Sequence, residues 1–148
     1  MVKVYDWIYH HARQSPDKMA QVDLFSGRRF TYAQMEERTA KLAGALLDLG
    51  VERGDRVALL GSNSTDCMDT EFACMKLGAV YVPLNWRLTV PELTFILTDC
   101  SPKVLIHEDI FADAGEALRT ACHINYLLET NGAGENSSFE LAIARARP

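Results

Sequence analysis

Apolar positions switch between a helical spacing and short continuous runs several times along this chain, which indicates alternating helices and strands. The clearest passage covers residues 75–93. Gly78 follows the last apolar position of a helical run, where a left-handed residue closes a helix. Residues 79–82 form a continuous apolar run, which is typical of a strand buried on both faces of a parallel sheet. Pro83 cannot donate a hydrogen bond to a neighbouring strand, so we expect the strand to end there.

The spacing of polar residues predicts where two further helices begin. Thr89 and Glu92 have the spacing of a capping box, with Pro91 inside the first turn, and they predict a helix over residues 90–99. Thr31 and Gln34 have the same spacing and predict a long helix that Gly50 ends.

The first 55 residues predict a helix over 4–14, a β-hairpin and this long helix. The hairpin consists of strands at 19–24 and 29–31 around a turn at 25–28. The apolar side of the first helix is formed by Val4, Trp7, Ile8 and Ala12, and that of the long helix by Tyr32, Met35, Leu42, Ala43, Leu46, Leu47 and Leu49.

Residues 56–128 alternate regularly between strand and helix. We expect strands at 56–60, 80–82, 103–107 and 123–128, with helices at 66–77, 90–99 and 110–120 between them; Met68, Phe72 and Met75 should point inward from the first of these helices. Each crossover is long enough to bring parallel strands side by side. The predicted fold class is therefore α/β: a doubly wound, mostly parallel sheet with flanking helices and an N-terminal β-hairpin.

We expect residues 1–148 to form one unit with three parts. Residues 1–55 hold the helix, hairpin and long helix, residues 56–128 hold the βαβ repeats, and residues 129–148 hold a polar connector and a short helix at 139–145.

Composition and charge narrow the function classes. Apolar residues make up 48% and charged residues 24% of the chain, as in ordinary globular proteins. The net charge of −5 leaves no basic stripe to neutralise phosphates, which argues against nucleic acid as a partner. No apolar run reaches the length of a transmembrane segment, and the N-terminus lacks an apolar signal core. We therefore expect a cytoplasmic location.

The cysteines and histidines show no metal-binding spacing. The cysteines are Cys67, Cys74, Cys100 and Cys122, and the histidines are His10, His11, His107 and His123. No C-x-x-C or H-x-x-x-H pair occurs among them, so we expect buried, reduced thiols and no metal.

Two glycine-containing loops invite comparison with phosphate sites. Residues 61–64 follow a strand and precede a helix, where either an anion or a helix cap fits, and capping is favoured because Asp66 and Asp69 already occupy the positive field of that helix. Gly132 and Gly134 belong to a loop without a following lysine, so an exposed loop is favoured over a phosphate loop.

Asn85, Trp86 and Arg87 are the candidate site residues, because they follow a strand at its carboxyl end. An exposed aromatic ring beside an arginine fits the wall of a substrate channel or a subunit interface, and it equally fits a cover over the sheet edge.

A group of acidic residues follows the strand that ends at His107; it consists of Glu108, Asp109, Asp113 and Glu116. Paired carboxylates perform acid–base chemistry or hold a metal, but they repel phosphate groups.

Three stretches of this sequence resemble core motifs of the adenylate-forming enzymes, the superfamily of acyl-CoA synthetases, luciferases and peptide-synthetase adenylation domains. The stretches are F-T-Y-x-x-M at 30–35, the segment from Leu49-Gly50-Val51 to Gly54-Asp55-Arg56-Val57, and the passage at 75–85. The resemblance covers roughly residues 7–144 and matches the opening part of such an enzyme. Asn85 after Pro-Leu resembles the fatty-acyl and aryl-CoA ligase branch, whereas amino-acid-activating domains usually carry aspartate there.

The resemblance implies a two-step reaction in the complete enzyme. ATP converts a carboxylic acid to an acyl-adenylate, and the thiol of CoA then displaces AMP; Mg²⁺ assists the first step. The family's phosphate loop, magnesium-binding glutamate, ribose-binding aspartate and C-terminal lysine have no counterpart here, so we expect no catalytic residue, no bound cofactor and no activity in residues 1–148 alone.

The partners implied are the missing C-terminal part of the same enzyme, a fatty or aryl carboxylic acid, and a second copy in a homodimer. The alternative hypothesis is a free-standing α/β module that binds a partner or a small ligand.

Overall fold

The structure is a computed structural model that describes residues 5–132 and 136–147. Its elements in chain order are α1 (Trp7–Gln14), β1 (Met19–Val22), β2 (Arg29–Thr31), α2 (Tyr32–Asp48), β3 (Arg56–Leu60), α3 (Thr65–Leu77), β4 (Val80–Leu84), α4 (Val90–Cys100), β5 (Val104–Glu108), the 3₁₀ turn η1 (Asp109–Phe111), α5 (Ala112–Ala121), β6 (Tyr126–Thr130) and α6 (Ser138–Arg145). Val4 lies outside the described residues. None of the helices in the described ranges has the length and apolar character needed to cross a membrane.

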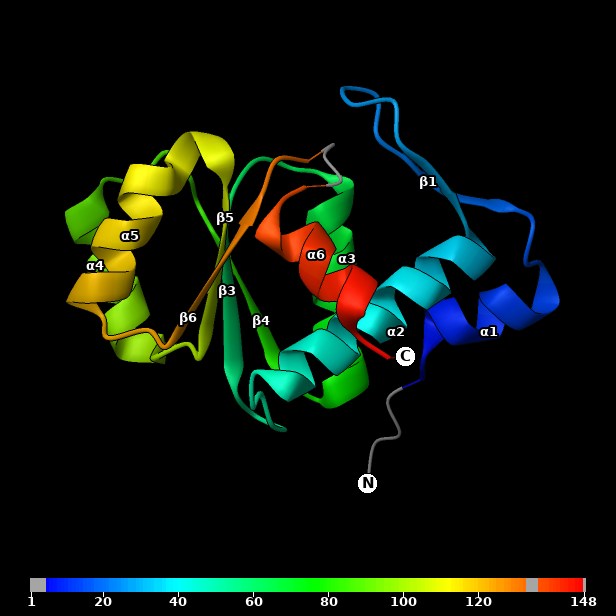
Figure 1. Cartoon of the computed structure of the whole chain (residues 1–148), viewed down its shortest axis with the longest axis horizontal. Coiled ribbons are helices and arrows are strands. Elements are labelled where there is room, and N and C mark those ends of the chain that lie inside the picture. The colour runs from blue at the N-terminus through cyan, green and yellow to red at the C-terminus, as the bar shows by residue number, and fades with distance from the viewer. Residues whose placement is uncertain (1–4, 133–135, 148) are drawn as a thin grey trace.

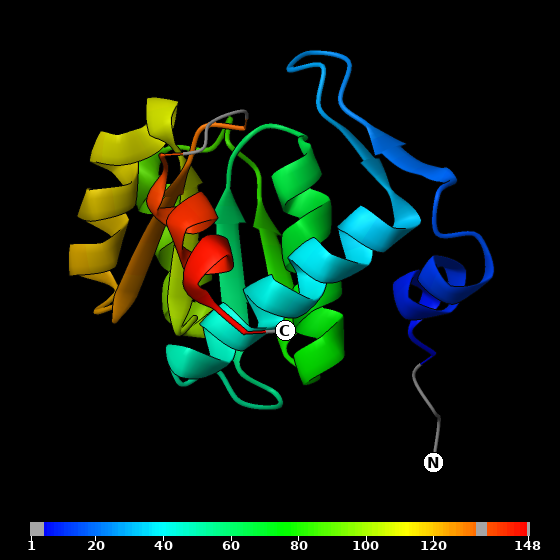
Figure 2. The same cartoon turned by 45° about the vertical axis from the view of Figure 1, so that its right-hand side comes forward.

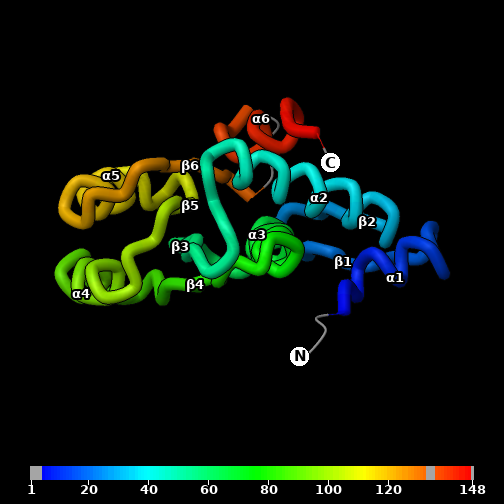
Figure 3. Tube along the Cα trace, turned by 90° about the horizontal axis from the view of Figure 1, so that it is seen from below, coloured from blue at the N-terminus to red at the C-terminus, as the bar shows by residue number. Residues whose placement is uncertain are grey.

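A four-stranded parallel sheet in the order β4-β3-β5-β6 forms the centre of the molecule (Figure 1). Helices α4 and α5 cover one face, and α2, α3 and α6 cover the other, as the view along the sheet shows (Figure 3). The antiparallel hairpin of β1 and β2 lies apart from this sheet, next to α2. The predicted α/β fold class is confirmed.

Alternate residues of β3 supply the two halves of the core. Val57 and Leu59 pack with the α2, α3 and α6 side, whereas Ala58 and Leu60 pack with the α4 and α5 side. Because β3 lies between two other strands and under helices on both faces, it is apolar at every position after Arg56.

The capping predictions are confirmed. Thr31 and Gln34 form a reciprocal capping box at the start of α2, and Thr89 and Glu92 form another at the start of α4. Gly78 closes α3 with φ of 68°, a left-handed conformation that costs glycine little.

The prediction that Pro83 ends a fully buried strand is wrong. Strand β4 continues to Leu84 and pairs with β3 on one side only, so its other edge is open within the described part of the chain. Proline is tolerated in an edge strand, where a missing N–H breaks no ladder. Because β4 is an edge strand, Val80 also keeps 48% of its surface exposed.

The predicted orientation of α3 is also wrong. Met68 and Met75 are exposed by 40% and 37%, and Phe72 is half-buried. The buried side of the helix carries polar side chains instead, among them Asp66 and Asp69. Two smaller corrections concern α1 and α2: Trp7 and Leu47, predicted to face the core, are exposed by 56% and 57%.

All four cysteines are free thiols, and only Cys74 is buried; the other three are half-buried.

Five charged side chains from four segments form a network where the hairpin, α2, α3 and α6 meet. Arg28 Nη1 lies 2.8 Å from Asp66 Oδ1, and Arg38 Nε lies 2.8 Å from Asp69 Oδ2. Both guanidinium groups also donate to Glu140 Oε1 at 2.8 Å. The two aspartates are almost completely buried, so their charges depend on the arginines for compensation.

Removing Arg38 should therefore destabilise the fold strongly. The Arg38→Met variant keeps the aliphatic volume but leaves Asp69 and Glu140 short of a cationic partner, and we expect a loss of about 3–5 kcal/mol in the free energy of unfolding. Urea denaturation followed by circular dichroism measures it. The control is Arg119→Ala, which breaks the exposed surface pair with Glu116 and should leave the free energy of unfolding close to that of wild type. If the two variants lost the same free energy of unfolding, the charge network would not be a major source of stability.

Candidate functional site

The carboxyl ends of the four parallel strands meet at one edge of the sheet, toward which the arrowheads of β3 and β4 point in Figure 2. The chain leaves β3 for β4 on one side and returns to β5 on the other. The connections therefore reverse direction at β3 and β5, and doubly wound sheets bind ligands at the carboxyl edge next to such a point.

A pocket of about 440 Å³ lies at this edge, over the ends of β3 and β4. Its walls are the loop of Gly61, Ser62 and Asn63, the side of β4, Cys67, and the segment of Asn85, Trp86 and Arg87. The structure thus brings the predicted site residues to the same hollow as the loop that follows β3.

The segment after β4 is a tight turn. The Arg87 amide donates to Asn85 Oδ1 at 3.1 Å, and the Leu88 amide donates to the Asn85 carbonyl at 3.0 Å. The Arg87 guanidinium lies 4.2 Å from the centre of the Trp86 ring, a cation–π geometry. No salt bridge in residues 5–132 and 136–147 involves Arg87. Its charge is therefore available to an anionic ligand.

The loop after β3 is fixed differently from the helix cap that we predicted. Ser64 occupies the N-cap position of α3, but its side chain makes no capping hydrogen bond. Ser62 instead donates through both its amide and its hydroxyl to Glu108 Oε2, each at 2.8 Å. Sequence reasoning named Ser62 and Glu108 separately and missed their contact.

The buried charge network reaches this edge from below. Asp66 accepts a hydrogen bond from the Thr130 hydroxyl at the end of β6, and that hydroxyl accepts one from the Gly132 amide at 3.2 Å. The Gly132 carbonyl accepts one from Arg28 at 3.0 Å. Gly132 is thus bound by the protein itself; Gly134, the second glycine of this loop, lies outside the described residues.

Burial raises the pKa of the Asp69 carboxyl from its ordinary value of 3.8 to about 6, although Arg38 opposes this change. Burial also works against ionisation of Glu140, but the hydrogen bonds and positive charges of Arg38 and Arg28 together outweigh it and lower the pKa of Glu140.

The acidic residues after β5 do not converge on one point. Glu108 binds Ser62, the Asp109 carboxylate accepts from the Ile110 amide, and Glu116 pairs with Arg119. Within the described ranges, no group of histidine, cysteine, aspartate and glutamate side chains has a geometry that fits a metal ion.

His107 is a packing residue of the β5–α5 unit. A methyl group added at Gly115 of α5 would lie 2.8 Å from His107 Cδ2, so the helix approaches the imidazole because position 115 has no side chain.

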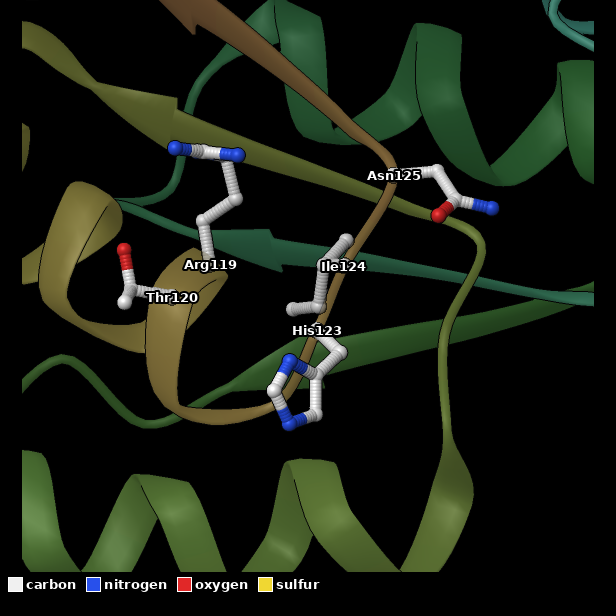
Figure 4. Close-up of a pocket in the computed structure, with 5 residues that line it drawn as sticks. All are labelled: Arg119, Thr120, His123, Ile124 and Asn125. Atoms are coloured by element: carbon white, nitrogen blue, oxygen red, sulfur yellow. The ribbon is translucent and has the colours of Figure 1, made fainter.

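A second pocket lies at the opposite edge of the sheet, between the end of α5 and the start of β6. Its lining residues are Arg119, Thr120, His123, Ile124 and Asn125 (Figure 4). The polar groups of Arg119, His123 and Asn125 point in different directions in this view, so they do not converge on one ligand.

The chain matches the family model described as "AMP-binding enzyme" over residues 8–144. It is 46% identical over 112 residues to a feruloyl-CoA synthase from Amycolatopsis sp, covering 76% of this chain and 22% of that protein. It is 43% identical over 108 residues to the long-chain-fatty-acid–CoA ligase FadD13 from Mycobacterium tuberculosis, covering 73% and 22%. The chain therefore spans about a fifth of the length of these relatives.

Among solved structures, the N-terminal domain of FACL13 from Mycobacterium tuberculosis superimposes with a TM-score of 0.88 at 33% identity. The superposition covers 99% of this chain and 37% of that one.

The raised pKa of Asp69 predicts a specific pH dependence of stability. Between pH 3.8 and about 6 the folded chain keeps a proton on Asp69 that the unfolded chain has lost, so this contribution to stability falls as the pH rises through the window and is constant above it. From pH 5 to pH 7, wild type should lose about 1 kcal/mol relative to Asp69→Asn.

Urea denaturation of both proteins at several pH values measures this difference. Asp113→Asn, which removes an exposed carboxylate of α5, is the control for the loss of one negative charge. Glu140 affects the pH dependence of stability in the opposite direction, because its pKa is lowered. This effect is confined to pH values at and below its ordinary pKa of 4.5, outside the range from pH 5 to pH 7. A flat difference between wild type and Asp69→Asn would contradict the prediction.

Proposed function

Because this chain belongs to the AMP-binding enzyme family, we propose that it forms the amino-terminal part of an acid–CoA ligase. The observation that carries the proposal is the agreement of one family model with residues 8–144, in a chain whose relatives include CoA ligases. Such an enzyme converts a carboxylic acid and ATP to an acyl-adenylate and pyrophosphate, after which the CoA thiol displaces AMP. A carboxylate is a poor electrophile, and adenylation gives it a leaving group.

The proposed substrate is a fatty or aryl acid, with a fatty acid as the first choice. Asn85 supports this class over amino acids, as in the sequence resemblance. A long-chain fatty acid and feruloyl appear in the names of two relatives, which supports the same class.

The described residues at the carboxyl edge do not fit ATP and Mg²⁺ by themselves. No lysine lines the pocket there, and the carboxylates of Glu108 and Asp66 are engaged by Ser62 and Arg28. Chemistry of this kind needs cations and a metal around the transferring phosphate. We therefore assign these groups to the part of the enzyme beyond this chain, and to this chain the wall of a substrate channel.

Arg87 is the group of this wall that would meet an anion. Its guanidinium stacks on Trp86 at the mouth of the pocket and has no acidic partner in the described ranges. A carboxylate or phosphate of the substrates would supply the missing negative charge.

Exposed apolar side chains support the proposal that further chain covers this unit. Leu24 and Phe25 at the hairpin tip are 92% and 102% exposed, and Met68 and Met75 project from α3. Leu24 and Phe25 are adjacent and fully exposed, and neighbouring exposed apolar groups of this kind fit a surface that another protein part covers. The remainder of the ligase is the proposed occupant, and a homodimer of residues 1–148 is the alternative.

Residues 1–148 alone should not catalyse adenylation. ATP–pyrophosphate exchange with Mg²⁺ and a panel of fatty and aryl acids should stay at background for this chain. A longer natural polypeptide that contains it should exchange pyrophosphate and form an acyl-CoA. Activity of residues 1–148 well above a heat-treated sample would refute the inactivity of the isolated chain, and an inactive longer polypeptide would refute the ligase assignment.

Arg87→Ala in the longer polypeptide should raise KM for the acid or for CoA about tenfold and leave the free energy of unfolding unchanged. The expected size corresponds to the loss of one charge-assisted hydrogen bond. Arg87→Lys keeps the charge and should recover part of the affinity. Arg119→Ala is the control, because Arg119 already has an acidic partner and lies at the opposite edge. Unchanged KM values for both substrates would exclude the role of Arg87.

A further inference from the structure

The corner between β5 and α5 touches both walls of the pocket at the ends of β3 and β4. We propose that Glu108, at this corner, is a positioning residue that sets the width of the pocket and thereby the affinity of the ligase for its acid or thiol substrate. The inference rests on the proposed function.

The first wall is the loop of Gly61, Ser62 and Asn63. One oxygen of Glu108, Oε2, accepts hydrogen bonds from the Ser62 amide and the Ser62 hydroxyl, both at 2.8 Å. A methyl group at Gly61 would lie 3.4 Å from the Glu108 Cβ and Oε2 atoms, so the loop backbone is in close contact with the carboxylate. Glu108 thus links the end of β5 to the loop that follows β3.

The second wall is the turn that carries Trp86 and Arg87. The Trp86 ring lies 6.3 Å, centre to centre, from the ring of Phe111 in η1. Because Phe111 follows Glu108 by three residues, one short segment supports both walls, and their separation depends on where this segment holds the loop.

The bridge is not needed to hold the sheet together. Strands β3 and β5 are already paired from Val57–Val104 to Leu60–His107, and the buried charge network contains neither Ser62 nor Glu108. Loss of the Glu108 carboxylate should therefore release the loop while the sheet stays folded. A residue with this property acts on the pocket rather than on the fold.

The first experiment measures hydrogen exchange in residues 1–148. Glu108→Ala should increase the exchange rate of the Ser62 amide about tenfold, whereas amides of β3 should stay protected and the melting temperature unchanged. Glu108→Gln, whose amide oxygen can still accept both hydrogen bonds, should behave like wild type. The control is Glu116→Ala, which removes an exposed carboxylate of α5. An unchanged Ser62 exchange rate in Glu108→Ala would overturn the bridge.

The second experiment uses the longer, active polypeptide. Glu108→Ala should raise KM for the acid or the thiol about tenfold with kcat within twofold of wild type, and Glu108→Gln should restore KM. The Ser62→Ala/Glu108→Ala double variant should show no larger increase in KM than Glu108→Ala alone, because the two residues act through one contact. An active Glu108→Ala enzyme with unchanged KM would overturn the inference and leave the proposed function standing. A wild-type polypeptide without ligase activity would instead overturn the proposed function.

Discussion

The buried pairing of two arginines with three carboxylates is the interaction on which the arrangement of this chain depends. Arg28 comes from the hairpin, Arg38 from α2, Asp66 and Asp69 from α3, and Glu140 from α6. An aspartate cannot be buried alone, so α3 can turn its polar side inward only if the hairpin and both neighbouring helices bring their charges to it. One electrostatic requirement thereby fixes the relative positions of segments that are more than 100 residues apart.

The same charges connect the fold to the edge where the candidate site lies. Asp66 binds Thr130 at the end of β6, and Arg28 binds Gly132 just after it, so the charge network also holds the end of an outer strand. Because these charged groups are already paired with one another, they are not free to bind a ligand at the edge. Ligand binding there is left to groups without such a partner. Arg87, stacked on Trp86 and without an acidic partner in the described ranges, is the clearest of these groups.

Local patterns predicted most of the fold because they are encoded within a few residues. Capping boxes, the left-handed Gly78 and the alternation of strands and helices needed no knowledge of distant partners. The buried side of α3 could not be found in this way: periodicity assigned Met68 and Met75 to the core, since it cannot show that Arg28 and Arg38 will neutralise Asp66 and Asp69. The contact of Ser62 with Glu108 was missed for a similar reason, because these residues are separated by 46 positions. The location of Asn85, Trp86 and Arg87 at a strand end followed from the alternation, but their companions in the pocket did not.

The stretch at 30–35, on which the family resemblance partly rests, has a physical explanation in the network. The Phe30 ring lies 5.1 Å from the Arg28 guanidinium and 4.9 Å from that of Arg38, so it supports both cations. Thr31 caps α2, the helix that carries Arg38, and Met35 is buried at 3% exposure on the same helix. Substitution of Phe30 would therefore disturb the position of two charges as well as the packing of one ring. This motif acts through the stability of the fold, and the groups that meet a substrate must be sought at the strand ends.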